Sequence, residues 1–319
     1  MEPARLTQPG LAVNLAGLEL KNPMLVASGT FGFGEEFINV AGFKNEEIGA
    51  IVLKGTTLEP REGNRPPRVA ETASGMLNSI GLHNPGVDSL VRDILPRLHV
   101  FDTKFIANIA GNTVDEYREV ARRLADAPEI SALEVNISCP NVHLGGLEFG
   151  TDPASAAAVI KAVRQVWPKP LIAKLTPNVT RITTVARICI EEGADILSLI
   201  NTLKGMVIDV NTRRPVLGNN TGGLSGPAIK PVAVHMVHQV HQLAKDKHVP
   251  LIGMGGICSA GDALEFMIAG ASAFAVGTSL FWNASVCREI IRGIQTYMIN
   301  NSIGSVSEIV GTVKMNQAL

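Results

Sequence analysis

Eight short apolar runs recur along the chain, and each one leads into a polar residue or a glycine. They cover residues 23–27, 50–53, 104–107, 132–135, 170–173, 196–200, 250–254 and 273–276. Runs of this kind are typical of strands buried on both faces, as in parallel sheets that are covered by helices. The pattern therefore predicts eight parallel strands.

Stretches with helical periodicity separate many of these runs, at residues 114–127, 154–167, 182–192, 230–245 and 260–269. Asp152 before Pro153 predicts a helix N-cap with proline at the first helical position, and Gly193 and Gly270 predict helix ends. Alternating strands and helices predict an α/β fold, a closed (β/α)8 TIM barrel. A doubly wound sheet would instead call for a G-x-G-x-x-G turn after its first strand, which residues 27–32 do not form.

The segments outside this alternation predict additions to the barrel. Residues 12–14 and 19–21 flank Gly17, and we expect them to form an N-terminal β-hairpin that caps the bottom of the barrel. The connections 56–85 and 203–226 are too long to be simple loops. Both leave the C-terminal face of the barrel, where long insertions build a site or an interface. We expect residues 1–319 to form a single domain.

Composition limits the classes of partner. The formal charge is −1 and no basic block is present, so neither a nucleic acid nor a membrane surface is expected as a partner. No apolar stretch approaches the ~20 residues of a membrane span, and the N-terminus lacks the apolar core of a signal peptide. The four cysteines are widely spaced without a C-x-x-C pair, which predicts no metal site in this chain and a cytoplasmic protein.

The residues that follow the predicted strands carry the candidate chemistry, because the C-terminal ends of barrel strands converge on one mouth. Two of them, Lys54 and Lys174, are costly inside a barrel mouth unless they face an anion or an electron-rich group, and neither has an acidic neighbour in sequence. The asparagines could bind a ligand rich in amide-like groups, or could be turn residues. The set comprises Ser28, Lys54, Asn108, Asn136, Cys139, Lys174, Asn201, Thr202, Gly255, Gly256, Gly277 and Thr278.

Two places within this set suggest particular roles. Cys139, between Asn136 and Asn141, is a candidate acid/base or nucleophile, although a buried packing cysteine is the alternative. Gly255-Gly256 and Gly277-Thr278 follow the seventh and eighth strands, the usual phosphate position of this fold. Backbone N–H groups at a helix start there could hold the phosphate of a sugar or of flavin mononucleotide (FMN).

Several segments resemble dihydroorotate dehydrogenase, in the same order along residues 11–304: Asn136–Asn141, Asn78–Asn84, Ala173–Pro177, Ile200–Thr202, Gly223–Pro231 and Met254–Ile257. A cysteine at position 139, where the membrane-associated class carries serine, resembles class 1. Gly55–Asn64, Glu148–Pro153 and Thr212–Pro215 resemble the NAD-linked subclass, 1B.

The resemblance implies oxidation of (S)-dihydroorotate to orotate in de novo synthesis of pyrimidines (UMP), with hydride passing to N5 of FMN. It implies that Cys139 is the general base, with Lys54 and Lys174 as further catalytic residues. The cofactor-binding residues that it implies are Ser28, Lys54, Gly55, Asn108, Asn136, Lys174, Ile200, Gly226, Gly255, Gly256, Gly277 and Thr278. The implied substrate-binding residues are Lys54, Asn78, Ser79, Ile80, Gly81, Leu82, Asn136, Asn141, Asn201 and Thr202.

Subclass 1B also implies a partner subunit that carries FAD and a [2Fe–2S] cluster and passes electrons to NAD+, with a homodimer of barrels inside a heterotetramer. Three alternatives stay open at this point: a class 1A enzyme that uses fumarate, a barrel aldolase with a Schiff base at Lys174, and a scaffold without catalysis.

Overall fold

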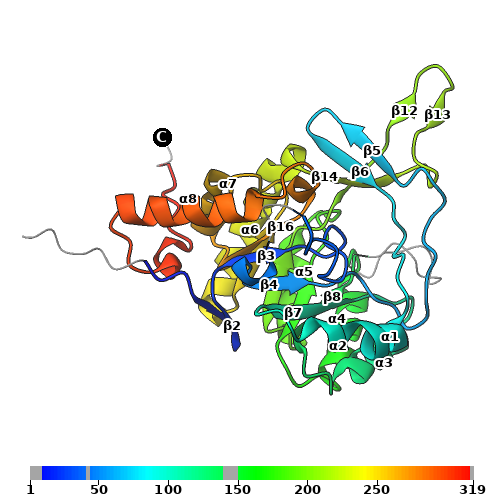
Figure 1. The fold of residues 1–319 in the computed structure, drawn as a ribbon, viewed down its shortest axis with the longest axis horizontal. Coiled ribbons are helices and arrows are strands. Elements are labelled where there is room, and N and C mark those ends of the chain that lie inside the picture. The colour runs from blue at the N-terminus through cyan, green and yellow to red at the C-terminus, as the bar shows by residue number, and fades with distance from the viewer. Residues whose placement is uncertain (1–8, 41–43, 139–149, 317–319) are drawn as a thin grey trace, which may run out of the picture.

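The computed structural model describes residues 9–40, 44–138 and 150–316, and eight of its strands close into a parallel barrel (Figure 1). In order around the ring they are β3 (Met24–Val26), β4 (Ala50–Val52), β7 (Lys104–Ile109), β8 (Ile130–Asn136), β9 (Leu171–Lys174), β10 (Ile196–Leu199), β15 (Leu251–Met254) and β16 (Ala273–Val276). Each coincides with one of the eight predicted runs. The prediction of a TIM barrel is confirmed.

Helices surround the barrel and bury the outward faces of its strands. The predicted ones are α3 (Val114–Leu124), α4 (Pro153–Arg164), α5 (Ile182–Glu191), α6 (Lys230–Ala244) and α7 (Ala260–Ala269). As expected, Asp152 caps α4 by accepting a 2.8 Å hydrogen bond from the Ser155 N–H, and Gly270 ends α7 with φ +127°. A further long helix, α8 (Val286–Asn300), follows the last strand, as a (β/α)8 barrel requires, although no helical stretch was assigned to these residues from the sequence.

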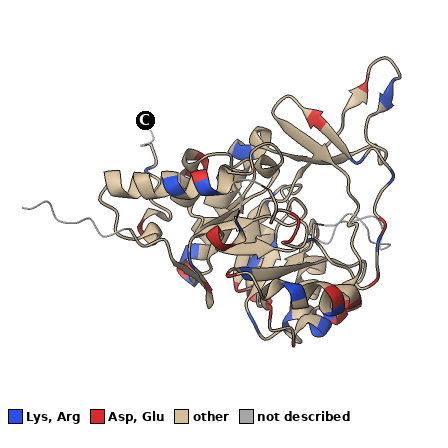
Figure 2. Ribbon diagram, in the orientation of Figure 1, with Lys and Arg blue, Asp and Glu red and all other residues tan. Residues whose placement is uncertain are grey.

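Shorter helical segments complete the chain. Residues 87–98 form α1 (Val87–Ser89), the π-helical turn η2 (Leu90–Ile94) and α2 (Leu95–Leu98). The 3-10 helices are η1 (Asn45–Glu47), η3 (Pro227–Ile229), η4 (Lys245–Lys247), η5 (Thr278–Phe281) and η6 (Val306–Ile309). Among the residues that the structure describes, no helix is long and apolar enough to cross a membrane. On the outer helices, basic and acidic residues lie side by side (Figure 2).

The predicted hairpin is confirmed and seals the bottom of the barrel. β1 (Val13–Leu15) pairs with β2 (Leu18–Leu20) around Gly17, which has φ +92°. Leu15, Leu18 and Leu20 are buried in one apolar cluster with the inward side chains of the lower barrel, among them Leu25, Ile106, Ala132, Ile172 and Ile252. The interior of the barrel is therefore packed with apolar side chains at this end.

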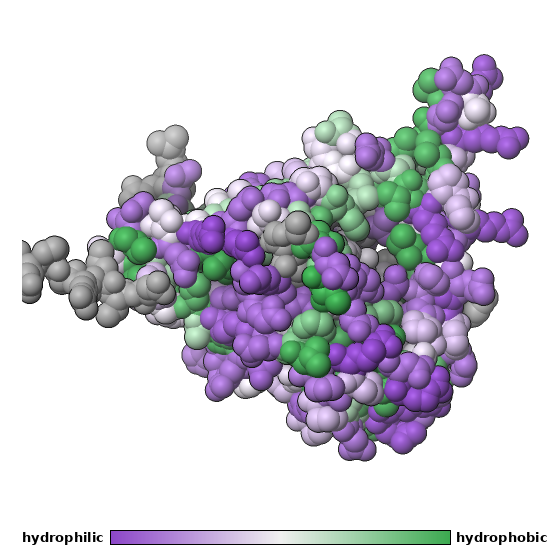
Figure 3. Space-filling view, in the orientation of Figure 1, coloured by the Kyte–Doolittle hydropathy of each residue, from purple (hydrophilic) through white to green (hydrophobic). Residues whose placement is uncertain are grey.

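The two long insertions combine into one antiparallel sheet at the opposite end. Its order is β11 (Leu203–Gly205), β14 (Gly222–Ser225), β6 (Gly75–Asn78) and β5 (Val69–Thr72). β12 (Ile208–Asp209) and β13 (Arg214–Pro215) form a hairpin that projects beyond it (Figure 1). Apolar and polar side chains share the surface of this projecting part (Figure 3), where Ile208 and Val210 are exposed.

Candidate active site

The interior of the barrel changes from apolar to polar toward the C-terminal ends of its strands. Side chains two residues apart in a strand face the same side. Because Ile106, Ala132, Ile172 and Ile196 point inward, the residues two positions later point inward as well. These are Asn108, Glu134, Lys174 and Ser198, and all four are buried.

Glu134 lies at the centre of this polar layer, and its side chain is 1% exposed. Its Oε1 accepts hydrogen bonds from Asn108 Nδ2 at 2.6 Å and from Lys174 Nζ at 3.3 Å, and its Oε2 accepts from Ser198 Oγ at 2.8 Å. Lys174 Nζ also donates to Ser28 Oγ at 3.2 Å. A buried carboxylate and a buried ammonium are tolerated because each has charged and hydrogen-bonding partners.

This pairing corrects the sequence analysis in one respect, because residues 132–135 were treated as an apolar strand. The absence of an acidic residue next to Lys174 in sequence left a distant partner open, and Glu134 lies 40 positions away. The strand is apolar on its outward face, where Leu133 and Val135 pack against the helices. Glu134 points inward, and a period of two counted back from Asn136 would have found it.

A cavity of about 540 Å³ opens above this layer. Every predicted site residue that the structure describes lines it: Ser28, Lys54, Gly55, Asn78, Ser79, Ile80, Gly81, Leu82, Asn108, Asn136, Lys174, Ile200, Asn201, Thr202, Gly226, Gly255, Gly256, Gly277 and Thr278. Cys139 and Asn141 lie outside the described residues. The structure thus gathers residues from all parts of the chain, and their individual roles stay predictions.

The asparagines at the mouth are held in a network. Asn201 Nδ2 lies 3.4 Å from Asn136 Oδ1, which also accepts a 3.2 Å hydrogen bond from the Ser138 N–H. Asn178, a lining residue that the sequence analysis did not select, donates to the Thr202 carbonyl at 3.0 Å. Its signal was the segment Ala173–Pro177, which stops one residue short of it.

The sheet of the insertions forms one wall of the cavity. Asn78, the last residue of β6, donates weakly to the Gly223 carbonyl of β14 at 3.4 Å. The turn after β6 needs glycine at position 81, because φ is +75° and a Cβ would lie 2.6 Å from the Asn64 nitrogen. Asn64, Met76, Lys204 and Phe281 are further lining residues that sequence reasoning missed.

Glycine loops after β15 and β16 form another wall. Gly256 has φ +83°, and a Cβ there would lie 2.8 Å from the Gly226 carbonyl oxygen. Within the described chain, the backbone N–H groups of Gly255, Gly256, Gly277 and Thr278 have no protein acceptor. Thr278 begins η5 as expected, but α7 begins only at Ala260, and the Ser259 side chain caps it. Gly255 and Gly256 are therefore loop donors rather than a helix start.

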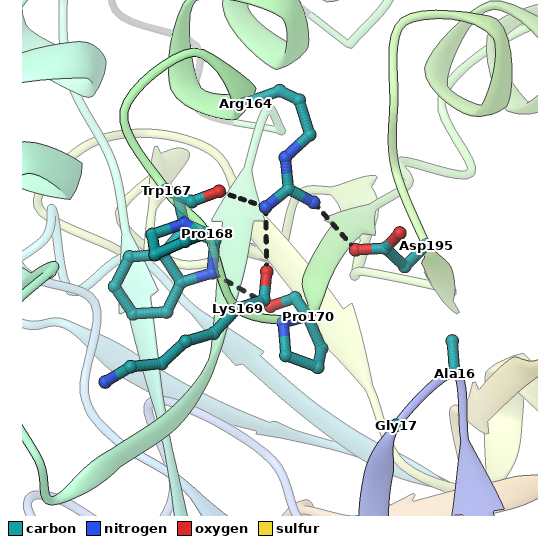
Figure 4. A pocket seen from close by; sticks show the side chains of 8 residues that line it. All are labelled: Ala16, Gly17, Arg164, Trp167, Pro168, Lys169, Pro170 and Asp195. Atoms are coloured by element: carbon teal, nitrogen blue, oxygen red, sulfur yellow. Dashed lines mark hydrogen bonds and ion pairs between the residues drawn. The ribbon is translucent and has the colours of Figure 1, made fainter.

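A second hollow, of about 510 Å³, lies at the bottom of the barrel beside the β1–β2 turn (Figure 4). Its polar groups satisfy one another. Arg164 donates to Asp195 Oδ2 and to the Lys169 carbonyl, both at 2.8 Å, and to the Trp167 carbonyl. The Trp167 indole N–H donates to the Pro170 carbonyl at 3.0 Å. This cluster fixes the turn before β9, and the mouth of the barrel is the better candidate for chemistry.

Comparison with known proteins identifies the family. The family model described as dihydroorotate dehydrogenase matches residues 10–298. The chain belongs to this family. The resemblance of its motifs is confirmed, including the NAD-linked subclass. "Dihydroorotate dehydrogenase B (NAD(+)), catalytic subunit" from Geotalea daltonii is 53% identical over 97% of this chain and 100% of its own length.

Two further relatives carry the same name. The protein from Desulforudis audaxviator is 55% identical over 94% of this chain and 96% of its own length. The protein from Desulforamulus reducens is 53% identical over 96% of this chain and 99% of its own length.

The mouth of this dihydroorotate dehydrogenase barrel fits a flavin mononucleotide. Asn108 Oδ1 is buried and without a hydrogen-bond partner in the described chain, so it can accept from a ring N–H. Lys174 supplies a fixed cation, and Ile200 and Met254 supply apolar wall. The free N–H groups of the glycine loops suit a phosphate, which accepts hydrogen bonds and carries negative charge. The donors thus match a planar ring with amide edges attached to a phosphate.

Proposed function

We infer that this chain catalyses the oxidation of dihydroorotate to orotate, in pyrimidine synthesis, as the catalytic subunit of an NAD+-linked enzyme. The observation that carries this conclusion is that one cavity, at the mouth of the barrel, is lined by every predicted site residue that the structure describes. Relatives with this name match the chain over nearly its whole length.

We propose FMN as the cofactor. The backbone N–H groups of Gly255, Gly256, Gly277 and Thr278 would hold its phosphate. Ser28, Asn108 and Lys174 would contact the polar edge of its ring, and Lys54, Gly55, Asn136, Ile200 and Gly226 would complete the binding site. When bound, FMN accepts the two electrons that leave the substrate. The Lys174 ammonium would stabilise negative charge on the ring.

The substrate would lie against the asparagines of the mouth. Asn78, Asn136, Asn201 and Asn141 offer amide donors and acceptors to a pyrimidine ring, with Thr202 beside them. The turn Ser79–Leu82 would hold the substrate carboxylate, and Ser79 Oγ is buried without a partner in the described chain. Lys54 is half-buried, and no hydrogen bond of its ammonium is found among the described residues, so it can pair with an anion.

We propose Cys139 as the general base. It would take the proton from C5 of the substrate onto Sγ. The residues that lead to it are held in place, since β8 ends at Asn136 and the Ser138 N–H donates back to the Asn136 side chain at 3.2 Å. Cysteine has an ordinary pKa of about 8.5, so a neighbouring positive charge would favour the thiolate at neutral pH.

We also propose a cytoplasmic heterotetramer, in which two barrels pair and each binds a subunit with FAD and a [2Fe–2S] cluster. The relatives' printed names support a second subunit through the words "catalytic subunit" and name NAD+. The sequence offers neither a dinucleotide fingerprint nor a cysteine cluster of its own.

An acceptor assay tests this function. We expect the purified chain to be yellow, with absorbance near ~450 nm from FMN, and to be bleached by dihydroorotate without oxygen. NAD+ should be reduced only when the partner subunit is added. A colourless protein would contradict the flavin site and would favour the alternative of a barrel aldolase with a Schiff base at Lys174. Turnover with fumarate by the chain alone, without gain from the partner, would instead indicate class 1A.

A further inference from the structure

We propose that Glu134 is a positioning residue that fixes Lys174 and Asn108 for the flavin and lowers the reduction potential of the bound cofactor. The inference rests on the FMN site proposed above and goes beyond it, because Glu134 does not line the cavity. It lies one layer below, behind the residues that would touch the ring.

The geometry of the carboxylate connects four neighbouring strands. Glu134 on β8 accepts from Asn108 on β7, Lys174 on β9 and Ser198 on β10. The three strand pairs that join these strands are parallel and hydrogen-bonded, and Glu134 is directly opposite Asn108 in the register. One buried group therefore sets the position of two of the three polar side chains that would face the ring edge, Asn108 and Lys174.

The carboxylate also decides which way Asn108 points. An ionised carboxylate only accepts hydrogen bonds, so the amide Nδ2 must turn toward Glu134. The Oδ1 atom then faces the other way, where it is buried and unpartnered in the described chain. A Cβ at position 55 would lie 2.9 Å from this oxygen, so Gly55 leaves the space beside it open. Asn108 thus presents an acceptor, and never a donor, to a ligand.

The charge of Glu134 acts in the same place. Its Oε1 is 3.3 Å from the Lys174 ammonium, and both side chains are at most 5% exposed, so water screens the pair poorly. An unpaired lysine ammonium would strongly favour the reduced form of the flavin, because that form carries more negative charge. The paired carboxylate offsets part of that attraction, and the flavin is therefore easier to reoxidise by the next carrier.

Ser198 offers a matched control. Its hydroxyl donates to Oε2, the oxygen that Lys174 and Asn108 do not use. Ser198→Ala removes one hydrogen bond from Glu134. It keeps the carboxylate charge and the two hydrogen bonds that Asn108 and Lys174 donate to Oε1. A packing defect in this layer should change the potential and the FMN affinity in both Ser198→Ala and Glu134→Gln. An effect of charge should appear only in Glu134→Gln.

The experiment measures the midpoint potential of bound FMN by anaerobic spectroelectrochemical titration, in the full chain saturated with FMN. For Glu134→Gln we expect reduced FMN to gain at least tenfold in affinity relative to oxidised FMN, which is a positive shift of about 30 mV for a two-electron couple. Oxidised FMN should bind at least fivefold more weakly, by flavin fluorescence, because the glutamine lets Asn108 rotate. Ser198→Ala should change either quantity less than threefold.

Glu134→Asp separates the effect of the negative charge from the effect of side-chain length. The shorter carboxylate keeps the charge but cannot meet all three donors, so FMN binding should weaken while the ratio of affinities stays within threefold of the wild type. If Glu134→Gln does not fold, a change of more than threefold in this ratio in Glu134→Asp, which keeps the charge, would by itself overturn the inference. An unchanged potential in folded Glu134→Gln, or an equal shift in Glu134→Asp, would overturn the inference. Failure of the wild-type chain to bind FMN would instead contradict the proposed function.

Discussion

The two lysines at the mouth, Lys54 and Lys174, lie in different environments, and this difference indicates different roles. Lys174 is 5% exposed and is held by Glu134 and Ser28 before any ligand arrives. Removing either member of such a buried pair leaves an uncompensated charge, which costs about 3–5 kcal/mol. Lys54 is half-buried, and no partner of its ammonium is found in the described ranges. Lys174 is therefore a fixed part of the barrel mouth, and Lys54 is the lysine that we propose to pair with the substrate.

Cys139→Ser tests the proposed base at this scale. Serine is a far weaker acid than cysteine, so its alkoxide is scarce near neutral pH. We expect turnover to fall about 10²- to 10⁴-fold, as for loss of a general base, and to recover partly as the pH rises. The pH profile of turnover and the flavin content measure this. Loss of FMN from the variant would show that Cys139 has a structural role instead.

At the scale of elements, the loops after β15 and β16 contribute backbone rather than side chains to the mouth. This arrangement depends on backbone conformations that other residues rarely adopt, such as φ +128° at Gly255 and +83° at Gly256. The neighbouring Gly226 carbonyl and the Cβ of Lys230 leave no room for a side chain at position 256. The loop after β15 therefore packs closely against Gly226 and the first residue of α6, Lys230.

Gly256→Ala should weaken FMN binding at least tenfold, because the new Cβ forces the loop away from Gly226 and misplaces its N–H groups. Gly261→Ala, in the first turn of α7, is the matched control, since a Cβ there meets only the Ser259 hydroxyl, at 3.6 Å. Fluorescence titration with FMN measures the affinity, and thermal unfolding measures any loss of stability, so the two effects can be separated. Equal FMN affinity in both variants would contradict a phosphate site at this loop.

Local sequence predicted the barrel well because each strand is an apolar run and each covering helix has its own period. Glu134 escaped notice because one charge among Ala132, Leu133 and Val135 barely changes an apolar run. The sheet at the mouth was harder to predict, since β6 and β14 pair across 145 positions of sequence and β14 is rich in glycine. Such long-range pairs leave no local pattern. The roles of the site residues came from the family motifs.

At the scale of the whole molecule, the two ends of the barrel are built for different purposes. The leucines of the hairpin close the bottom, and the Arg164 cluster beside it is satisfied internally. The other end is open and lined with polar groups from nearly the whole chain. The four cysteines are spread along the chain, at positions 139, 189, 258 and 287, so their reactivities report on separate parts of the molecule.

Thiol labelling should distinguish these cysteines in the native protein. Burial raises the pKa of Cys189 to about 12, and burial with the nearby Glu47 raises the pKa of Cys287 to about 12. Burial and Asp262 also raise the pKa of Cys258. The thiolate is the reactive form, so a raised pKa leaves little of it at pH 8. We expect iodoacetamide at pH 8 to modify Cys139 first, Cys258 slowly, and neither Cys189 nor Cys287.

Mass spectrometry of peptides taken over time measures the rates, and urea-unfolded protein, in which all four thiols should react, is the control. Orotate should slow the reaction of Cys139 if it lies beneath the substrate. Rapid labelling of Cys189 in the folded chain would contradict its burial on α5.

The closure of the barrel also determines when the enzyme can mature. The ring closes where β3 pairs with β16, so that Val26 meets Val276. A ribosome adds about 5–20 residues per second, so the first strand waits on the order of 10–50 s for its last neighbour. During this time the unpaired apolar edge of β3 is exposed and can be bound by chaperones. The glycine loops after β15 and β16 also come after residue 254, so the proposed FMN site is complete only once Thr278 has been synthesised.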